Sequence, residues 1–108
     1  MIGPWLVHTV FFTLKDDTPE GRKRLVASCK KYLTDHPGTV FFAVGIRATD
    51  IEWTVSDTKY HVVLHLVFES KMAHDEYQES PRHQQFLEEN EADWADVRVA
   101  DAYVEHEP

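Results

Sequence analysis

The sequence predicts an α+β fold in which two helices cover one face of a four-stranded antiparallel sheet. Two observations lead to this prediction. Segments rich in β-branched and aromatic residues alternate with segments of helical periodicity, in the order β-α-β-β-α-β. Helix-start signals also precede both helical segments. A chain of 108 residues suits one domain and is short for two, so we expect a single domain over residues 1–108, with its core at about 5–104.

The first strand is predicted over residues 5–14, where both alternating faces are apolar. His8 falls on the same face as Val10 and Phe12. A strand that is apolar on both faces must be covered on each side.

The first helix is predicted to begin at Thr18-Pro19, because Thr caps a helix well and Pro suits its first position. We expect it to end at His36-Pro37-Gly38, where Pro cannot continue it. A second strand is predicted over residues 39–47, followed by a polar loop over 48–58 with Trp53 at its tip.

The third strand is predicted over residues 59–68 and the fourth over residues 96–104. Between them, Ser70 caps a helix that runs to about Glu91. Ser80-Pro81 interrupts this helix, because Ser is a good cap and Pro suits the first position of a new helix.

A count of apolar faces predicts the assembly. Two helices can cover only one face of this sheet, and Val7 and Phe11 lie on the other. We therefore expect a twofold homodimer whose sheets pack face to face. His61 and His65 lie at that interface or face the helices, depending on the register of the third strand.

Composition and charge exclude several classes of partner. The net charge is −8, and residues 69–108 hold 12 acidic and 3 basic side chains, so nucleic acid would be repelled. No apolar run approaches the roughly 18 residues of a membrane span, and the first residues lack a signal-peptide pattern. The single Cys29 cannot form an internal disulfide and fits the helix core, which indicates a reducing, cytoplasmic location.

The interrupted helix carries the candidate chemistry. Tyr77 lies on the apolar side of the first segment, and His83 is the third residue of the second. Phe86 and Leu87 follow on the same side as His83, so both polar rings should face one apolar space. A phenol and an imidazole placed in this way can bind or move protons, or they can be satisfied structural residues of the core.

Four segments together resemble the Dabb family, the stress-responsive dimeric α/β-barrel domain. They are Val7-His8-Thr9-Val10-Phe11-Phe12, Phe68-Glu69-Ser70, the block Tyr77…Ser80-Pro81-Arg82-His83…Phe86, and Asp101-Ala102-Tyr103. The resemblance covers roughly residues 5–104. It implies a ferredoxin-like fold and a homodimer in which two sheets form a barrel with the helices outside.

The resemblance also implies site residues. Some plant members are polyketide cyclases that use a Tyr and a His of this block and a His on the first strand, in a pocket between helices and sheet. The matching residues here are Tyr77, His83 and His8. A further His of those enzymes falls at Val62, with His61 one residue away and therefore on the opposite face of the strand.

Three functions are consistent with these observations. The first is a homodimer that binds a small apolar or aromatic ligand between sheet and helices, against Phe12, Phe86 and Leu87. The second is a cyclase- or lyase-like enzyme in which His83 is the base, Tyr77 stabilises an enolate and His8 orients either group. The third, by fold analogy alone, is a haem-degrading monooxygenase.

No cofactor and no metal are expected. The sequence has neither an HxH nor an HExxH pattern. His61 and His65 would lie about 13 Å apart along an extended strand, which is too far for them to share an ion.

Overall fold

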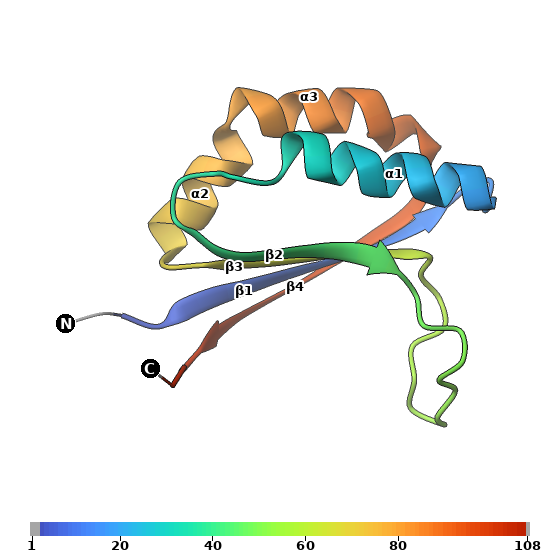
Figure 1. Cartoon of the computed structure of the whole chain (residues 1–108), viewed down its shortest axis with the longest axis horizontal. Helices are drawn as coiled ribbons and strands as arrows, with labels where there is room; N and C mark the ends of the chain where they lie inside the picture. The colour runs from blue at the N-terminus through green and yellow to red at the C-terminus, as the bar shows by residue number, and fades with distance from the viewer. Residues whose placement is uncertain (1–2, 108) are drawn as a thin grey trace.

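The computed structural model describes residues 3–107, whose strands form one antiparallel sheet with the helices on one of its faces (Figure 1). The strand order is β2-β3-β1-β4, so β1 and β3 are central. The predicted architecture is confirmed. In chain order the elements are β1 (Trp5–Leu14), α1 (Pro19–Tyr32), β2 (Thr39–Ile46), β3 (Val62–Phe68), α2 (Lys71–Glu79), α3 (Pro81–Asn90), the 3-10 turn η1 (Glu91–Asp93) and β4 (Trp94–Val104).

Side-chain caps fix the three helix starts that the sequence predicts. The hydroxyl of Thr18 accepts a hydrogen bond from the backbone N–H of Gly21 at 3.0 Å, and Ser70 caps α2 in the same way. Ser80 accepts from the backbone N–H of His83 at 3.1 Å, which separates α3 from α2. Each cap satisfies a backbone donor that the first helical turn leaves unpaired.

Strand β2 ends at Ile46, one residue before the predicted end, and three other boundaries differ by two residues or more. Helix α1 ends at Tyr32, before the predicted end at His36-Pro37-Gly38. An imidazole N–H of His36 donates a hydrogen bond to the Tyr32 carbonyl at 2.8 Å and so caps the end of the helix. Strand β3 begins at Val62 and not at residue 59. Strand β4 begins at Trp94 and not at residue 96, because it pairs with β1 as far as Leu14.

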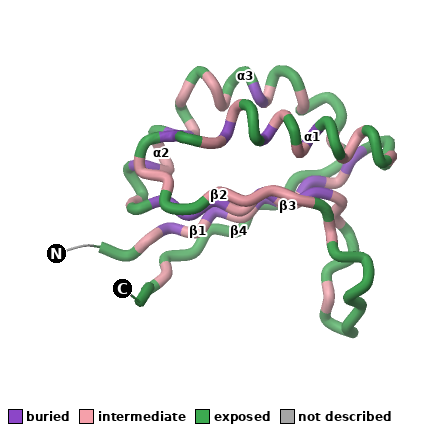
Figure 2. The backbone as a smooth tube through the Cα atoms, in the orientation of Figure 1, coloured by how far each residue is buried: buried purple, intermediate pink, exposed green. Residues whose placement is uncertain are grey.

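The core lies between the helices and the inner face of the sheet, where the buried residues gather (Figure 2). Cys29 is fully buried there, as predicted, and burial raises the pKa of its thiol to about 12. The main contributors are Leu6, Val10, Phe12, Leu64, Leu66 and Phe68 from the sheet, and Leu25, Leu33, Ala73, Tyr77 and Phe86 from the helical side.

The outer face of the sheet, defined as the face turned away from the helices, is largely apolar. Val7 pairs with Val67, and Phe11 pairs with Val63, all on this face. On the edge strand β2, Phe41 is 53% exposed. No helix among residues 3–107 covers this surface, so the chain by itself leaves an apolar face open.

The two histidines of the β3 segment have different positions. His65 lies on the outer face, where its Nδ1 is 3.0 Å from the hydroxyl of Thr9. His61 precedes β3, and its Nδ1 accepts a hydrogen bond from the backbone N–H of Leu14 at 3.0 Å. Both imidazoles therefore have polar partners outside the space between sheet and helices.

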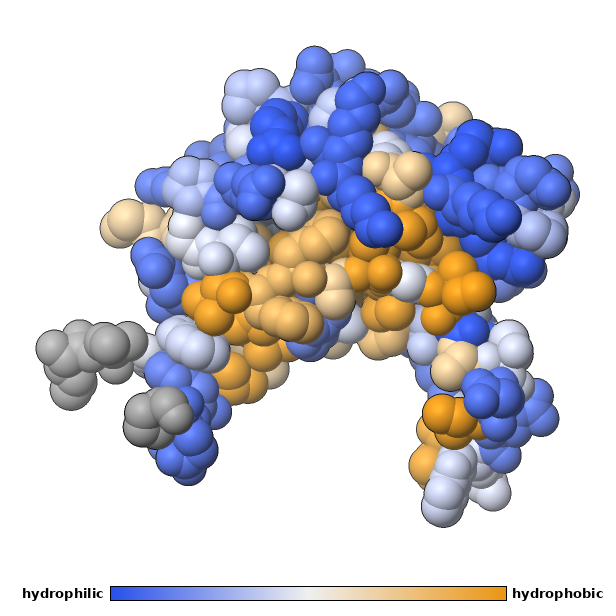
Figure 3. Space-filling model, viewed as in Figure 1, coloured by the Kyte–Doolittle hydropathy of each residue, from blue (hydrophilic) through white to orange (hydrophobic). Residues whose placement is uncertain are grey.

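The segment 47–61 projects from the sheet on the side opposite the helices (Figure 1). Trp53 is 75% exposed and Val55 is 92% exposed, so this loop carries apolar side chains into solvent. Figure 3 shows that apolar surface also gathers along the sheet layer, beneath more polar helices. Among residues 3–107, no helix is both long and apolar enough to cross a membrane.

Candidate functional site

A cavity of about 220 Å³ lies between the inner face of the sheet and the helices α2 and α3. All six site residues proposed from the sequence line it: His8, Phe12, Tyr77, His83, Phe86 and Leu87. The remaining lining side chains are Gln78 and the apolar Val10, Leu33, Leu64, Trp94, Val97 and Val99. A mainly apolar wall with a few polar groups is typical of a small-molecule pocket.

His8 is held in one orientation by a carboxylate. It lies on β1 directly opposite Asp101 of β4, and its side chain is only 3% exposed. Its Nδ1 lies 2.6 Å from Oδ1 of Asp101, and a carboxylate can only accept, so Nδ1 carries the proton. Burial lowers the pKa of His8, and Asp101 opposes that shift. The neutral ring therefore keeps a lone pair on Nε2, which lies 3.5 Å from the amide nitrogen of Gln78.

Tyr77 and His83 face each other edge-on at the helix break. Their ring centroids are 5.0 Å apart, with 78° between the planes. Burial raises the pKa of Tyr77, so it remains a neutral phenol. Burial, followed by the nearby His8, His36 and His74, lowers the pKa of His83 to about 4. The imidazole is thus neutral near pH 7 and able to accept a proton.

Two polar atoms of cavity-lining residues have no partner. Nδ1 of His83 and the indole N–H of Trp94 are both buried, and neither has a hydrogen-bond partner among residues 3–107. Buried polar groups are usually paired. Both atoms therefore have hydrogen-bonding capacity that residues 3–107 leave unused, and both residues line the cavity.

Sequence reasoning missed three polar residues near this cavity. Asp101 belongs to a motif of the last strand, but its position opposite His8 can be predicted only when the register between β1 and β4 is known. Gln78 and His74 lie one helical turn apart on α2, with 3.4 Å between Nε2 of His74 and the Gln78 amide nitrogen. Their i, i+4 spacing on a predicted helix was the sequence signal that could have placed these two side chains next to each other. His8, His74 and Asp101 each offer a potential metal ligand atom within 4.8 Å of the others.

The two third-strand positions considered from the sequence do not supply a further catalytic group. Val62 is fully buried in the core, and its side chain has no acid–base chemistry. His61 is not among the residues that line the cavity.

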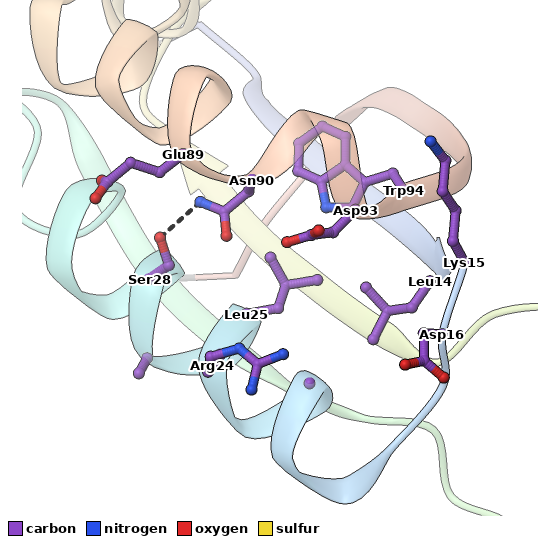
Figure 4. Close-up of a pocket in the computed structure, with 12 residues that line it drawn as sticks. Leu14, Lys15, Asp16, Arg24, Leu25, Ser28, Glu89, Asn90, Asp93 and Trp94 are labelled. Carbon is purple, nitrogen blue, oxygen red and sulfur yellow. Dashed lines mark hydrogen bonds between the residues drawn. The ribbon is translucent and has the colours of Figure 1, made fainter.

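A larger hollow of about 440 Å³ lies between α1 and the region where α3 leads into β4 (Figure 4). Its rim carries charges of both signs, including Lys15, Arg24 and Asp93. The hydrogen bond drawn there joins the amide of Asn90 to the hydroxyl of Ser28 at 2.7 Å. Among residues 3–107, no histidine lines this hollow, whereas His8 and His83 line the smaller cavity; Trp94 lines both. We therefore place the candidate site in the smaller one.

Comparisons with known proteins agree with this architecture. The family model described as the stress responsive A/B barrel domain, Dabb, matches residues 6–104. No curated protein matches the sequence. A Dabb family protein with a ferredoxin-like fold from Mesorhizobium loti is similar in structure, with a TM-score of 0.77, 23% identity, and coverage of 95% of this chain and 99% of that one.

Two further solved structures show the same fold. A dimeric ferredoxin-like protein of unknown function from Thermobifida fusca has a TM-score of 0.78 and 17% identity, over 94% of this chain and 92% of that one. A hydroxynitrile lyase from Passiflora edulis has a TM-score of 0.75 and 15% identity, over 97% of each chain. At these identities the likeness concerns the fold.

Proposed function

The chain belongs to the stress responsive A/B barrel (Dabb) family, and on that premise we propose that it forms a homodimer and binds a small apolar or aromatic molecule in the cavity between sheet and helices. The observation that carries the binding proposal is the cavity wall. It is mainly apolar, and it includes residues with two buried, unpaired polar atoms, Nδ1 of His83 and the indole N–H of Trp94.

The size of the cavity suggests the size of its ligand. An apolar cavity of about 150 Å³ accommodates benzene. The 220 Å³ found here suits one substituted ring. A haem is far larger, so the geometry gives less support to the monooxygenase alternative.

The homodimer proposal rests on the outer face of the sheet. Val7, Phe11, Val63 and Val67 form an apolar surface without a helix over it, and burial of such a surface against a second copy is favourable. The structurally similar Thermobifida fusca protein is described as dimeric, which supports a dimer here.

Ligand binding can be tested with benzaldehyde as the probe, followed by amide chemical shifts in ¹H–¹⁵N spectra. The variant Val99→Trp should weaken binding by at least about tenfold, because it adds bulk at a half-exposed cavity residue without disturbing the core. Met72→Trp is the matched control, since Met72 lies on α2, is 71% exposed and does not line the cavity. Equal binding by wild type and Val99→Trp would contradict a ligand site in this cavity.

The neutral His83 favours a second function, acid–base catalysis on a carbonyl compound. The imidazole would take a proton from the carbon next to the carbonyl, and the electrons of that C–H bond would form an enolate. Tyr77 would donate a hydrogen bond to the enolate oxygen, because its pKa is raised and its hydroxyl stays protonated. His8, fixed by Asp101, would position the bound molecule.

This chemistry can be tested by the exchange of acetophenone methyl protons for deuterium in D₂O. His83→Gln should lower the protein-dependent rate by roughly 10²-fold or more, and Tyr77→Phe should lower it as well. His106→Gln, at a residue that stacks on Trp5 and does not line the cavity, is the control that should leave the rate unchanged. Mandelonitrile cleavage is a useful second assay, because one structural neighbour is a hydroxynitrile lyase. If neither probe reacts faster than in buffer, the acid–base proposal is contradicted.

A further inference from the structure

Two imidazole nitrogens converge on one point at the polar end of the cavity. Nε2 of His8 lies 3.5 Å and Nε2 of His74 lies 3.4 Å from the same amide nitrogen of Gln78. The two imidazole rings are 4.9 Å apart between centroids. The residues come from different elements, His8 from β1 and the other two from one turn of α2, so the tertiary fold creates this arrangement.

Both imidazoles are held in the same tautomer. Nδ1 of His8 lies 2.6 Å from an oxygen of Asp101, and Nδ1 of His74 lies 2.9 Å from an oxygen of Asp75. Since carboxylates only accept, each Nδ1 carries the hydrogen and each Nε2 carries a lone pair. A histidine that binds a metal typically donates its other ring N–H to a carboxylate in this way.

We propose that this cluster binds one divalent transition-metal cation per chain, with Nε2 of His8 and Nε2 of His74 as ligands. The positively polarised amide nitrogen of Gln78 now lies between the two lone pairs, where a cation would be stabilised. Rotation of that amide by half a turn would supply its oxygen as a third ligand. The proposal does not rest on the apolar ligand, although His8 and Gln78 line the same cavity.

The negative charges around the cluster and its exposure to solvent are suitable for a bound cation. The carboxylate of Asp101 lies behind His8, at its Nδ1, and that of Asp75 lies behind His74. One potential ligand atom from each of His8, His74 and Asp101 lies within 4.8 Å of the others. The side chain of His74 is 17% exposed and that of Asp101 is 43% exposed, so the cluster can be reached from solvent. Imidazole nitrogens favour Zn²⁺, Ni²⁺ and Co²⁺ over Mg²⁺ and Ca²⁺.

The test uses the full chain without an affinity tag, stripped with chelator, and Co²⁺ as the probe. Isothermal titration should give one ion per chain, with visible absorption bands that saturate at the same stoichiometry. His74→Ala should weaken binding by about 100-fold or more, because it removes a ligand, and Asp101→Asn should weaken it about 10- to 100-fold. His106→Ala is the matched control, since His106 stacks on Trp5 outside the cluster and its loss should change nothing.

A gain of affinity gives a second, independent measurement. Gln78→Glu places a carboxylate oxygen between the two imidazoles and should tighten Co²⁺ binding by about tenfold. His74→Ala should remain folded, because Ala is a good helix former at this partly exposed position of α2. Equal Co²⁺ affinity in wild type and His74→Ala would overturn the proposal. So would the absence of saturable binding by wild type up to about 1 mM, or equally tight binding of Mg²⁺.

Discussion

Replacement of His83 by Gln should reduce the loss of stability that acid causes. The pKa of His83 in the folded protein is about 4, below its ordinary value of 6.5, because of burial and then the nearby His8, His36 and His74. Between these two values the unfolded chain binds more protons than the folded chain. The stabilising contribution is therefore complete above about pH 6.5, falls as the pH is lowered and is gone below about pH 4.

The size of the effect follows from the shift. A fall of this size in the pKa of His83 corresponds to about 3 kcal/mol for a group fully shielded from water. His83 is only partly buried, so we expect about 1–2 kcal/mol after solvent screening. Gln fills similar space and can form hydrogen bonds, but it does not titrate.

Urea unfolding at a series of pH values between about 7.5 and 4 would measure this contribution. The free energy of unfolding should fall about 1–2 kcal/mol further in the wild type than in His83→Gln, because acid effects on other groups are common to both. His106→Gln, on the C-terminal tail, should follow the wild type. If wild type and His83→Gln lose stability in parallel, or if His83 titrates near pH 6.5 by NMR, the imidazole is not desolvated and the reasoning fails.

Two further perturbations test the fold and the assembly. Gly38 has φ of +81°, and a Cβ there would lie 2.4 Å from the Cβ of Ala73, so Gly38→Ala should lower the free energy of unfolding by about 2–4 kcal/mol in urea. Gly45→Ala, with nothing within 4 Å, should cost less than about 1 kcal/mol, and similar losses for both variants would refute the steric account. Phe11→Asp should yield a monomer by sedimentation velocity at micromolar concentration, because it puts a charge on the outer face. Met72→Asp should leave the dimer intact, and a dimeric Phe11→Asp would argue against this interface.

Local signals in the sequence predicted the elements well. The break between α2 and α3 is visible because Ser80 and Pro81 have strong positional preferences at helix starts. The alternation of side chains along β1 predicted correctly that His8 lies on the inner face of the sheet. This prediction needs only local sequence, because successive side chains of a strand point to opposite faces. The end of α1 at Tyr32 was not predicted. The hydrogen bond from the His36 ring to the Tyr32 carbonyl depends on the conformation of that side chain, which residue type alone does not reveal.

The polar end of the cavity was harder to predict, because it joins residues far apart in the chain. Asp101 meets His8 only through the β1–β4 register, and no short-range pattern specifies which strands are neighbours. His74 stands in no sequence motif that marks it as a site residue, unlike Tyr77 and His83. The convergence of His74 and His8 on Gln78 depends on how α2 packs over β1, which is set by tertiary contacts.

The central place of β1 has a consequence for biosynthesis. β1 is the first strand to leave the ribosome, yet it pairs with β3 and with β4, whose ladder joins Trp5 to Val104. Such distant pairing makes folding slow, and it leaves an apolar segment exposed throughout translation. β1 can therefore complete its pairing on both edges only after residues 94–104 have been synthesised.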